Sequence, residues 1–355
     1  MNRIGVGIIG LSADAGWAAR SHLPALRALG GQFEITAVAG SSPERSRAAA
    51  TQYGIACAAD SAAALAAHPD VDLVVVAVKV PHHRVLVEAA LAARKAVLCE
   101  WPLAIDAAEA DLLAAHAAGA GVRNFVGLQA RASAAMQQLR TLIRDGAIGD
   151  ILASNIVAAV GVPWNGMTDR SRTYLNRNAS GATMLSIPFG HCLDAMNWVL
   201  GDFATFSAEL MTRRTATLVQ DEGILIPTDV ADQVMVSGRL ESGTAAVLHY
   251  RGGLSSAGNF RWEINGTDGD ILVQGGDGHL QYGRVDILLA KTGAPLAPVV
   301  LPPDPLPPHG RAIAAQYRAI HFAMIDAPSD GPDFAHAAAL HHKLGAIADK
   351  AAAAH

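Results

Sequence analysis

The sequence predicts an α/β protein of two domains, the first built on a parallel sheet and the second on a large, mostly antiparallel, open sheet. Three patterns in the 355 residues predict this fold class. Short apolar runs alternate with helical segments as far as residue 129, which is typical of βαβ units. A glycine-bounded turn directly follows the first of these runs. From residue 205 onward, segments that alternate apolar and polar residues are separated by glycine turns, as in an antiparallel sheet with one solvated face.

In the first domain, placed over residues 1–125, strands and helices alternate regularly. The apolar and β-branched runs predict strands at 4–10, 33–39, 71–78, 97–99 and 125–129. Apolar residues at helical spacing predict helices at 17–29, 43–53, 61–67, 83–93 and 107–118. Pro24 is the one obstacle in the first helix, and Ser42 before Pro43 is a typical helix start. This order predicts a Rossmann dinucleotide-binding domain.

The second domain is placed over residues 126–355. A helix at 136–145 leads through a glycine turn into a strand at 151–160. The segment 161–180 is polar and irregular, and a loop of that length is usually functional or mobile. A helix is predicted at 187–200, and strands at 205–212, 230–240, 244–250, 259–265 and 269–273. A proline-rich linker at 301–308 precedes two last helices, at 311–325 and 333–353, which could pack back on the first domain.

Composition excludes several classes of function. Hydrophobic residues make up 51% of the chain and charged residues 17%, so large cores are expected and disorder is not. The formal net charge of −5 comes without a basic stripe, so we expect no nucleic-acid surface. No apolar run approaches about 18 residues, so we expect no membrane span. Cys57, Cys99 and Cys192 lie too far apart for a disulfide framework or a zinc site, so we expect a cytoplasmic protein without a metal.

The turn at residues 10–16 is a candidate site for the pyrophosphate of a dinucleotide. The standard fingerprint is G-x-G-x-x-G, whose glycines allow a tight turn and close approach of the pyrophosphate. Here Gly10 is retained, Ser12 stands at the position of the middle glycine, and Gly16 follows in a longer loop before Trp17. The alternative is a tight turn that binds no nucleotide.

The end of the second strand bears on the choice of cofactor. An acidic residue there would accept the ribose 2′-hydroxyl of NAD. This chain instead has small hydroxyl residues, Ser41 and Ser42, with Arg45 close behind them, and this set could bind a 2′-phosphate. We therefore expect NADP or NAD, with a slight preference for NADP. In the alternative, Ser42 only caps the next helix.

Two further stretches carry candidate chemistry. The run at 97–104, VLCEWPLA, ends a buried strand in Glu100, Trp101 and Pro102, and ligands of open α/β sheets lie beyond the carboxyl ends of the strands. His191 and Asp194 are three residues apart in a predicted helix and so share a face. An imidazole is the side chain best matched to proton transfer near neutral pH, which makes His191 a candidate base. The alternative is a helix histidine that packs at the domain interface.

These motifs resemble those of the family of glucose–fructose oxidoreductase and inositol dehydrogenase. The run at 97–104 is similar to the family's VLCEKPLA, and His83 matches its histidine at the start of the preceding helix. The turn at 146–150, GAIGD, matches GxIG(D/E), and His191 with Asp194 matches H-x-x-D. Within the family, the chain resembles the subgroup of the fungal galactose-regulon repressor. That closer resemblance rests on residues 10–18, 100–101 and 189–191 and on Gln129 and Arg131.

The resemblance implies an NAD(P)-dependent oxidoreductase that acts on a sugar or polyol hydroxyl. The nicotinamide carries the hydride, and the protein supplies position and a base. The catalytic candidates are His191 as the base, Asp194 and Glu100. The residues expected at the cofactor are Gly10, Leu11, Ser12, Gly16, Trp17, Ser41, Ser42, Arg45, Val78, His83, Glu100, Trp101 and Gln129. The residues expected at the substrate are Trp101, as a stacking platform, Arg131, Tyr174 and His191.

Two departures from the family pattern open a second hypothesis. Family enzymes have a lysine that contacts substrate and cofactor where this chain has Trp101, and tryptophan offers neither a positive charge nor a usable proton. The family's aspartate four residues before the histidine is Ile187 here. The alternative is therefore a dinucleotide-binding sensor without turnover that acts with a protein partner, as the fungal repressor does. The resemblance also implies a homodimer or homotetramer, because family sheets commonly pack face to face between subunits.

Overall fold

The structure, a computed structural model, describes residues 3–14 and 16–353. The chain divides into two compact units: unit 1 comprises residues 1–129 and 304–341, and unit 2 comprises residues 130–303 and 342–355. The expected boundary after residue 125 falls inside strand β6 (Asn124–Gly127), which belongs to unit 1. Unit 1 is thus discontinuous in sequence.

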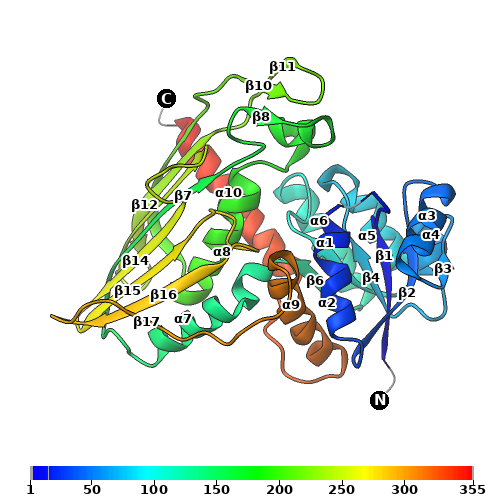
Figure 1. The fold of residues 1–355 in the computed structure, drawn as a ribbon, viewed down its shortest axis with the longest axis horizontal. Helices are drawn as coiled ribbons and strands as arrows, with labels where there is room; N and C mark the ends of the chain where they lie inside the picture. The colour runs from blue at the N-terminus through cyan, green and yellow to red at the C-terminus, as the bar shows by residue number, and fades with distance from the viewer. Residues whose placement is uncertain (1–2, 15, 354–355) are drawn as a thin grey trace. The chain divides into compact units, whose positions relative to one another are not determined.

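Unit 1 is built on a six-stranded parallel sheet with the order β3-β2-β1-β4-β5-β6 (Figure 1). Its other strands are β1 (Ile4–Ile9), β2 (Phe33–Ala39), β3 (Cys57–Ala58), β4 (Leu73–Val76) and β5 (Ala96–Glu100). Every residue of β1, β4 and β5 is buried, as expected for parallel strands covered on both faces. The parallel sheet predicted from the alternation of strands and helices is confirmed.

The helices of unit 1 follow the predicted order with one correction. They are α1 (Trp17–Arg20), α2 (His22–Ala28), α3 (Pro43–Tyr53), α4 (Ala62–Ala66), α5 (His83–Ala92), α6 (Ala107–Ala120) and α9 (Pro308–Met324). The single helix predicted at 17–29 is wrong, because the chain breaks at Ser21. Pro24 has no N–H to donate to the carbonyl of Arg20, and the Ser21 hydroxyl donates to the Trp17 carbonyl at 2.7 Å.

Helix α9 completes the core of unit 1 from far along the sequence. It packs against α2 and buries Ile313, Tyr317 and Ile320 completely or nearly so. These side chains join one apolar cluster with strand residues such as Ile8 and Leu98. The last helix, α10 (Phe334–Ala353), begins in unit 1, and the division between the units falls inside it.

Unit 2 is built on an eight-stranded sheet with the order β17-β16-β15-β14-β7-β13-β12-β9. Its strands are β7 (Ile151–Val160), β9 (Phe203–Met211), β12 (Gln233–Leu240), β13 (Ala245–Gly252), β14 (Phe260–Gly266), β15 (Gly269–Gly275), β16 (Val285–Lys291) and β17 (Ala297–Pro298). Only β7 and β13 pair in parallel, so the predicted large, mostly antiparallel sheet is confirmed. A small second sheet joins β8 (Met167–Thr168), β10 (Ala216–Val219) and β11 (Ile224–Pro227). The strands β8, β10, β11, β16 and β17 were not predicted, and neither was β3 of unit 1.

Helices α7 (Ala134–Arg144) and α8 (Gly190–Leu200) lie against one face of the eight-stranded sheet (Figure 1). Along β13, Ala246, Leu248 and Tyr250 are buried while Val247 is exposed, which is the alternation expected of a sheet covered on one face. The helix predicted at 187–200 begins later, because a π-helical turn, Leu185–Phe189, precedes it and contains Pro188. Among the described residues, no helix is long and apolar enough to span a membrane.

Candidate functional site

The carboxyl ends of β1 and β4 meet where the strand order of the parallel sheet reverses. From β1, the chain first continues to β2 on one side and later returns to β4 on the other. Ligands of open α/β sheets bind at such a switch point. Gly10 has φ +99°, and a Cβ there would lie 2.4 Å from the carbonyl oxygen of Ala77, after β4. Only glycine allows the two loops to come this close.

The loop after Gly10 is fixed by contacts at Leu11 and Ser12 and has an open backbone at Gly16. Leu11 is buried, and the carbonyl oxygen of Ser12 accepts a hydrogen bond from the Tyr53 hydroxyl at 2.9 Å. Gly16 has φ +144°, and a Cβ there would meet no atom within 4 Å, so its backbone is open to close approach. The helix that follows is the single turn α1, so the dipole at this loop is that of one turn and not that of the longer helix predicted at 17–29.

Of the three residues expected to choose between NAD and NADP, Ser41 and Ser42 lie between β2 and α3, and Arg45 lies in the first turn of α3. Ser42 is the N-cap of α3: its hydroxyl accepts from the Arg45 N–H at 3.4 Å. The capping role proposed as the alternative is therefore present. Ser41 and Arg45 are exposed and lie at the carboxyl end of β2, where a ribose 2′-substituent is bound in this kind of fold.

Glu100, at the end of β5, is the centre of a buried hydrogen-bond network. One carboxylate oxygen accepts from Trp17 Nε1 at 2.8 Å, and the other lies 2.9 Å from His22 Nε2. Because a carboxylate only accepts, His22 donates through Nε2, and a neutral ring then accepts from the Tyr317 hydroxyl, 2.8 Å from Nδ1. The network holds Trp17, at the start of α1, to the carboxyl end of β5.

Sequence reasoning missed two members of this network. His22 and Tyr317 are 295 residues apart in the chain, and neither belongs to a motif. Burial, together with the Glu100 carboxylate, raises the pKa of Tyr317 well above its ordinary value, so its hydroxyl stays protonated and can donate. The only sequence signal was the placement of both residues on predicted amphipathic helices.

His83 and Trp101 fill the space around the cis peptide between Trp101 and Pro102. His83 Nδ1 lies 2.9 Å from the carbonyl oxygen of Pro102, and Nε2 lies 3.1 Å from that of Val78. Burial lowers the pKa of His83, against the opposing effect of these carbonyl oxygens. Trp101 is only 5% exposed, and its ring centroid is 4.6 Å from that of His341. The ring is therefore buried and packs on His341, and its role as a stacking platform for a sugar stays a prediction.

Gln129, after β6, is the clearest sign of a ligand at this edge of the sheet. Its side chain is 1% exposed, and neither its Oε1 nor its Nε2 has a hydrogen-bond partner among the described residues. Leaving a buried polar group unsatisfied costs about 1–3 kcal/mol. A ligand that carries its own amide would satisfy both atoms. The residues at this edge thus fit a nicotinamide dinucleotide.

In unit 2, His191 lies in the first turn of α8 and is 3% exposed. Burial lowers the pKa of His191 to about 3; Asp194 opposes this shift and His279 adds to it. The ring is therefore neutral at physiological pH. Its Nδ1 has no hydrogen-bond partner among the described residues.

Asp194, one turn further along α8, forms a buried ion pair with Arg131. Arg131 Nε donates to Asp194 Oδ2 at 2.8 Å, and Nη2 donates to Oδ1, so the contact is bidentate. The side chains are 10% and 1% exposed, respectively. Asp194 was predicted as a catalytic residue and Arg131 as a substrate residue, and in the structure these two charged groups contact each other.

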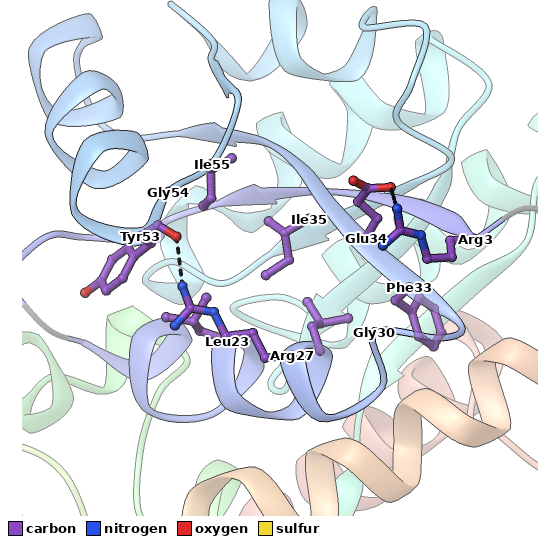
Figure 2. Close-up of a pocket in the computed structure, with 11 residues that line it drawn as sticks. Arg3, Leu23, Arg27, Gly30, Phe33, Glu34, Ile35, Tyr53, Gly54 and Ile55 are labelled. Carbon is purple, nitrogen blue, oxygen red and sulfur yellow. Dashed lines mark hydrogen bonds and ion pairs between the residues drawn. The ribbon is translucent and has the colours of Figure 1, made fainter.

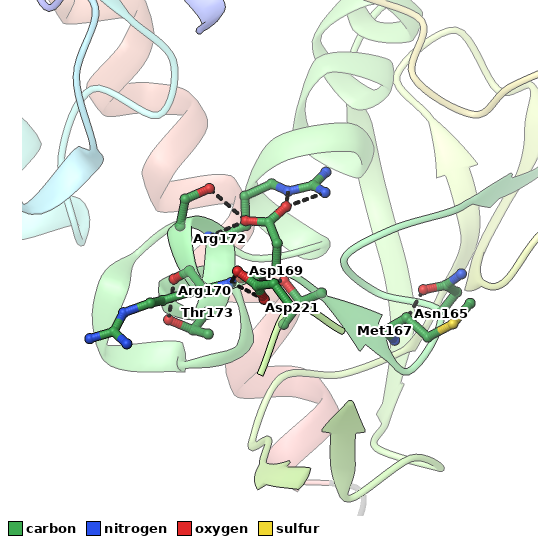
Figure 3. A network of polar contacts seen from close by, with 9 residues as sticks. Asn165, Met167, Asp169, Arg170, Arg172, Thr173 and Asp221 are labelled. Atoms are coloured by element: carbon green, nitrogen blue, oxygen red, sulfur yellow. Dashed lines mark hydrogen bonds and ion pairs between the residues drawn. The ribbon is translucent and has the colours of Figure 1, made fainter. Parts of the chain in front are cut away.

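The irregular segment 161–180 is ordered by acidic side chains (Figure 3). It contains two 3₁₀ turns, η3 (Arg170–Asn176) and η4 (Asn178–Ser180). Asp169 caps η3 by accepting from the Arg172 N–H at 3.1 Å, and Asp221 accepts from the Arg170 N–H at 3.0 Å. Tyr174, a predicted substrate residue, lies in η3, and partial burial raises its pKa.

A separate pocket of about 290 Å³ lies at the amino end of β2 (Figure 2). None of the predicted site residues lines it. Its two arginines are engaged, since Arg27 donates to the Tyr53 carbonyl at 2.8 Å and Arg3 pairs with Glu34 at 2.6 Å. Because ligands of open α/β sheets bind at the carboxyl ends of strands, this pocket is not the predicted cofactor site. Within residues 3–14 and 16–353, no group of His, Cys, Asp or Glu could hold a metal ion.

Comparison with known families gives two matches that together span most of the chain. Residues 4–128 match the family described as "Oxidoreductase family, NAD-binding Rossmann fold". Residues 135–275 match the family described as "Gal80p, C-terminal domain". The family predicted from the motifs is confirmed, as is the likeness to the galactose repressor subgroup.

Among curated proteins, the dehydrogenase aclE of Aspergillus oryzae is 34% identical over 284 residues, which cover 77% of each chain. The 1,5-anhydro-D-fructose reductase of Ensifer adhaerens is 32% identical and covers 90% of this chain and 88% of the reductase. The galactose/lactose metabolism regulatory protein GAL80 of Saccharomyces cerevisiae is 28% identical and covers 82% of this chain and 71% of the regulator.

Solved structures show the same fold at lower identity. A super-repressor mutant of Gal80p from Saccharomyces cerevisiae superimposes with a TM-score of 0.91 at 22% identity, covering 100% of this chain and 97% of the other. Levoglucosan dehydrogenase in complex with NADH and levoglucosan gives 0.85 at 21% identity, covering 99% and 98%.

Proposed function

The chain belongs to the oxidoreductase family with an NAD-binding Rossmann fold, and from that premise we propose that it is an NAD(P)-dependent oxidoreductase acting on a hydroxyl of a sugar or polyol. The observation that carries this proposal is the buried Gln129, whose amide has no partner among the described residues at the carboxyl edge of the parallel sheet. The activities for which relatives are named support the substrate class: one is a reductase of an anhydro sugar, and others are dehydrogenases of apiose and inositol.

The cofactor is proposed to lie along the carboxyl ends of β1, β2 and β4. Gly10 and Gly16 would let the pyrophosphate approach the backbone, and Gln129 would bind the carboxamide. Exposed Ser41 and Arg45 would take the ribose 2′-substituent, and we retain the slight preference for NADP. When bound, the nicotinamide supplies the hydride acceptor.

His191 is proposed as the proton acceptor. Its lowered pKa keeps the ring unprotonated at neutral pH, as a base requires, but also makes it a weak base. General acid–base catalysis contributes about 10²–10⁴-fold, and a base this far below the working pH belongs at the lower end. Asp194 then acts indirectly, because its ion pair with Arg131 fixes this part of α8.

The cofactor claim is tested by titrating NADPH and NADH into the protein, with tryptophan fluorescence and calorimetry as readouts. We expect Arg45→Ala to weaken NADPH binding about tenfold, or about 1.4 kcal/mol, and to leave NADH binding unchanged. Arg47→Ala is the matched control, since Arg47 is exposed on the same helix and pairs with Glu44. If neither NADPH nor NADH binds, the cofactor proposal is wrong.

Turnover is tested by screening sugars and polyols for absorbance at the reduced-nicotinamide band. His191→Ala should lower kcat about 10²-fold. A variant with wild-type kcat would remove His191 from the role of base.

The second candidate function is a dinucleotide-binding sensor without turnover. Two observations favour it: Trp101, packed on His341, replaces the lysine of family enzymes, and residues 135–275 match the C-terminal domain of Gal80p. Tight NADPH binding with no turnover across a broad screen would select this function. A protein partner would then be sought by pull-down with and without NADPH.

We further propose a homodimer or homotetramer in the cytoplasm. The face of the eight-stranded sheet opposite α7 and α8 exposes Val157 and Val247 on neighbouring strands, and covering such side chains stabilises an assembly. The three cysteines are free thiols, as in reducing compartments. Light scattering that gives a monomeric mass would contradict the assembly.

A further inference from the structure

A second histidine lies near His191 in unit 2, on the connection between β15 and β16. His279 is 7% exposed and interacts electrostatically with His191. Gln281, two residues further on, is 4% exposed, and its Nε2 lies 3.0 Å from His279 Nδ1. No motif in the sequence marks this connection.

The connection is anchored to the part of the fold that carries His191. The Tyr250 hydroxyl, on β13, donates to the carbonyl oxygen of Gly278 at 2.9 Å. The same tyrosine ring meets Phe189, directly before α8, edge to face at 5.7 Å. The Gly278 N–H donates to the Ala159 carbonyl, and a Cβ on Gly278 would lie 2.7 Å from that oxygen. The strands β7 and β13 and the start of α8 therefore set the position of His279.

The hydrogen-bond pattern of this cluster suits hydroxyl groups. An amide nitrogen only donates, so His279 Nδ1 accepts from Gln281 and the ring proton lies on Nε2. Gln281 Oε1 and His191 Nδ1 are buried and have no partner among the described residues. A hydroxyl both donates and accepts, so a molecule with several hydroxyls would satisfy these atoms. Buried polar atoms without hydrogen-bond partners are rare in proteins, so a polar ligand is expected at this cluster.

The charges around the cluster favour a neutral ligand. The ring of His191 is uncharged, because burial, reinforced by His279, lowers its pKa to about 3. The carboxylate of Asp194, which acts on the same ring, is compensated by the bidentate contact with Arg131. A carboxylate or phosphate on the ligand would meet no uncompensated cation in this set of residues, and burying such a charge is unfavourable.

Resting on the proposed function, we propose that His279 and Gln281 bind the substrate together with His191, and that the substrate is an uncharged polyhydroxyl compound, as opposed to a sugar acid or sugar phosphate.

The test measures binding of five probes by saturation-transfer NMR in the presence of NADPH. Levoglucosan, myo-inositol and D-xylose are the neutral probes, and D-gluconate and D-glucose 6-phosphate are the charged ones. We expect one or more neutral probes to bind the wild type and neither charged probe to bind. His279→Ala and Gln281→Leu should each weaken neutral-probe binding tenfold or more while NADPH affinity is retained.

The matched control is His249→Ala. His249 also pairs with a glutamine on the same sheet, and its Nε2 donates to Gln233 Oε1 at 3.1 Å. Because side chains alternate along a strand, His249 lies on the face of β13 opposite to that of Tyr250, which bonds to this connection. Its loss should leave probe binding unchanged. His279→Gln keeps an N–H donor and should recover part of the affinity, which a loss of packing alone would not do. Gln281→Leu gives an independent readout if His279→Ala does not fold.

Each outcome decides between the two proposals. Wild-type probe affinity in both variants, preference for a charged probe, or no binding of any neutral probe overturns this inference. If both variants turn over substrate with unchanged KM, the inferred role of His279 and Gln281 is wrong, but the oxidoreductase function is supported. If both variants weaken neutral-probe binding but the wild type turns over no compound in the broad sugar and polyol screen, the two residues bind a neutral ligand and the oxidoreductase function is overturned.

Discussion

The buried ion pair between Arg131 and Asp194 gives the sharpest stability prediction. Its side chains are 10% and 1% exposed, so each charge depends on the other for its solvation. Removing one partner of a buried pair costs about 3–5 kcal/mol, whereas replacing both with apolar residues is often close to neutral. We expect Arg131→Met and Asp194→Leu each to destabilise by about 3–5 kcal/mol, and the double variant to lie within about 2 kcal/mol of the wild type.

The assay is urea unfolding at pH 7 of the wild type, both single variants and the double variant. Because the chain has two units, hydrogen exchange of α8 peptides should accompany it, to report on the unit that carries the pair. Arg261→Met is the matched control: Arg261 pairs with Glu263 on β14, both half exposed, and such pairs contribute about 0–1 kcal/mol. The reasoning fails if a single variant loses less than about 1 kcal/mol, or if the double variant loses the sum of the two.

Three other predictions follow from the same structure. The first concerns pH. The pKa of His191 is about 6.5 in the unfolded chain and about 3 in the folded chain, so between these values only the unfolded chain binds the proton. The free energy of unfolding should therefore be about 2 kcal/mol lower at pH 5 than at pH 7. His191→Phe should remove that slope in urea titrations at the two pH values. Trp17→Phe removes one donor to Glu100 and should cost about 1–3 kcal/mol of stability by the same assay; unchanged stability would contradict the network. Gly10→Ala should abolish NADPH binding or folding, because its Cβ would meet the Ala77 carbonyl oxygen. A variant that binds NADPH with the wild-type affinity in calorimetry would refute this.

The sequence predicted the elements whose patterns are local. The runs of β1 and β4 are apolar throughout because helices cover both faces of their sheet. Such an uninterrupted apolar run can be recognised directly in the sequence. Strand β16 left a weaker trace: partly polar and near the sheet edge, it has little alternation to recognise. The break at Ser21 was signalled by Pro24, which lies too far into the predicted helix 17–29 to be tolerated. In the structure it is the third residue of α2, in the first turn, where a missing N–H costs no intrahelical hydrogen bond.

The candidate site was predictable only as far as motifs reach. The motif at 97–104 placed Glu100 at the end of a strand, and the structure has it there. His22 contacts Glu100 across 78 positions of the chain, and Tyr317 contacts His22 across 295. Both contacts depend on tertiary packing, which no local pattern encodes. The helical spacing predicted Asp194 on the same side of α8 as His191. In the structure, the Asp194 carboxylate forms an ion pair with Arg131, which lies outside that helix. A pairwise preference of that kind depends on which surfaces meet.

The discontinuity of unit 1 has a consequence for the order of events during synthesis. His22 and the apolar strands of this unit are synthesised long before Tyr317, the hydrogen-bond partner of His22, because all of residues 130–303 are made in between. At about 5–20 residues per second, that interval lasts on the order of ten to thirty seconds. During it, the nascent nucleotide-binding unit lacks the helix that fills its core, and the surface that α9 will cover is open to chaperones and proteases. The part of the chain that is translated first is thus among the last to be finished.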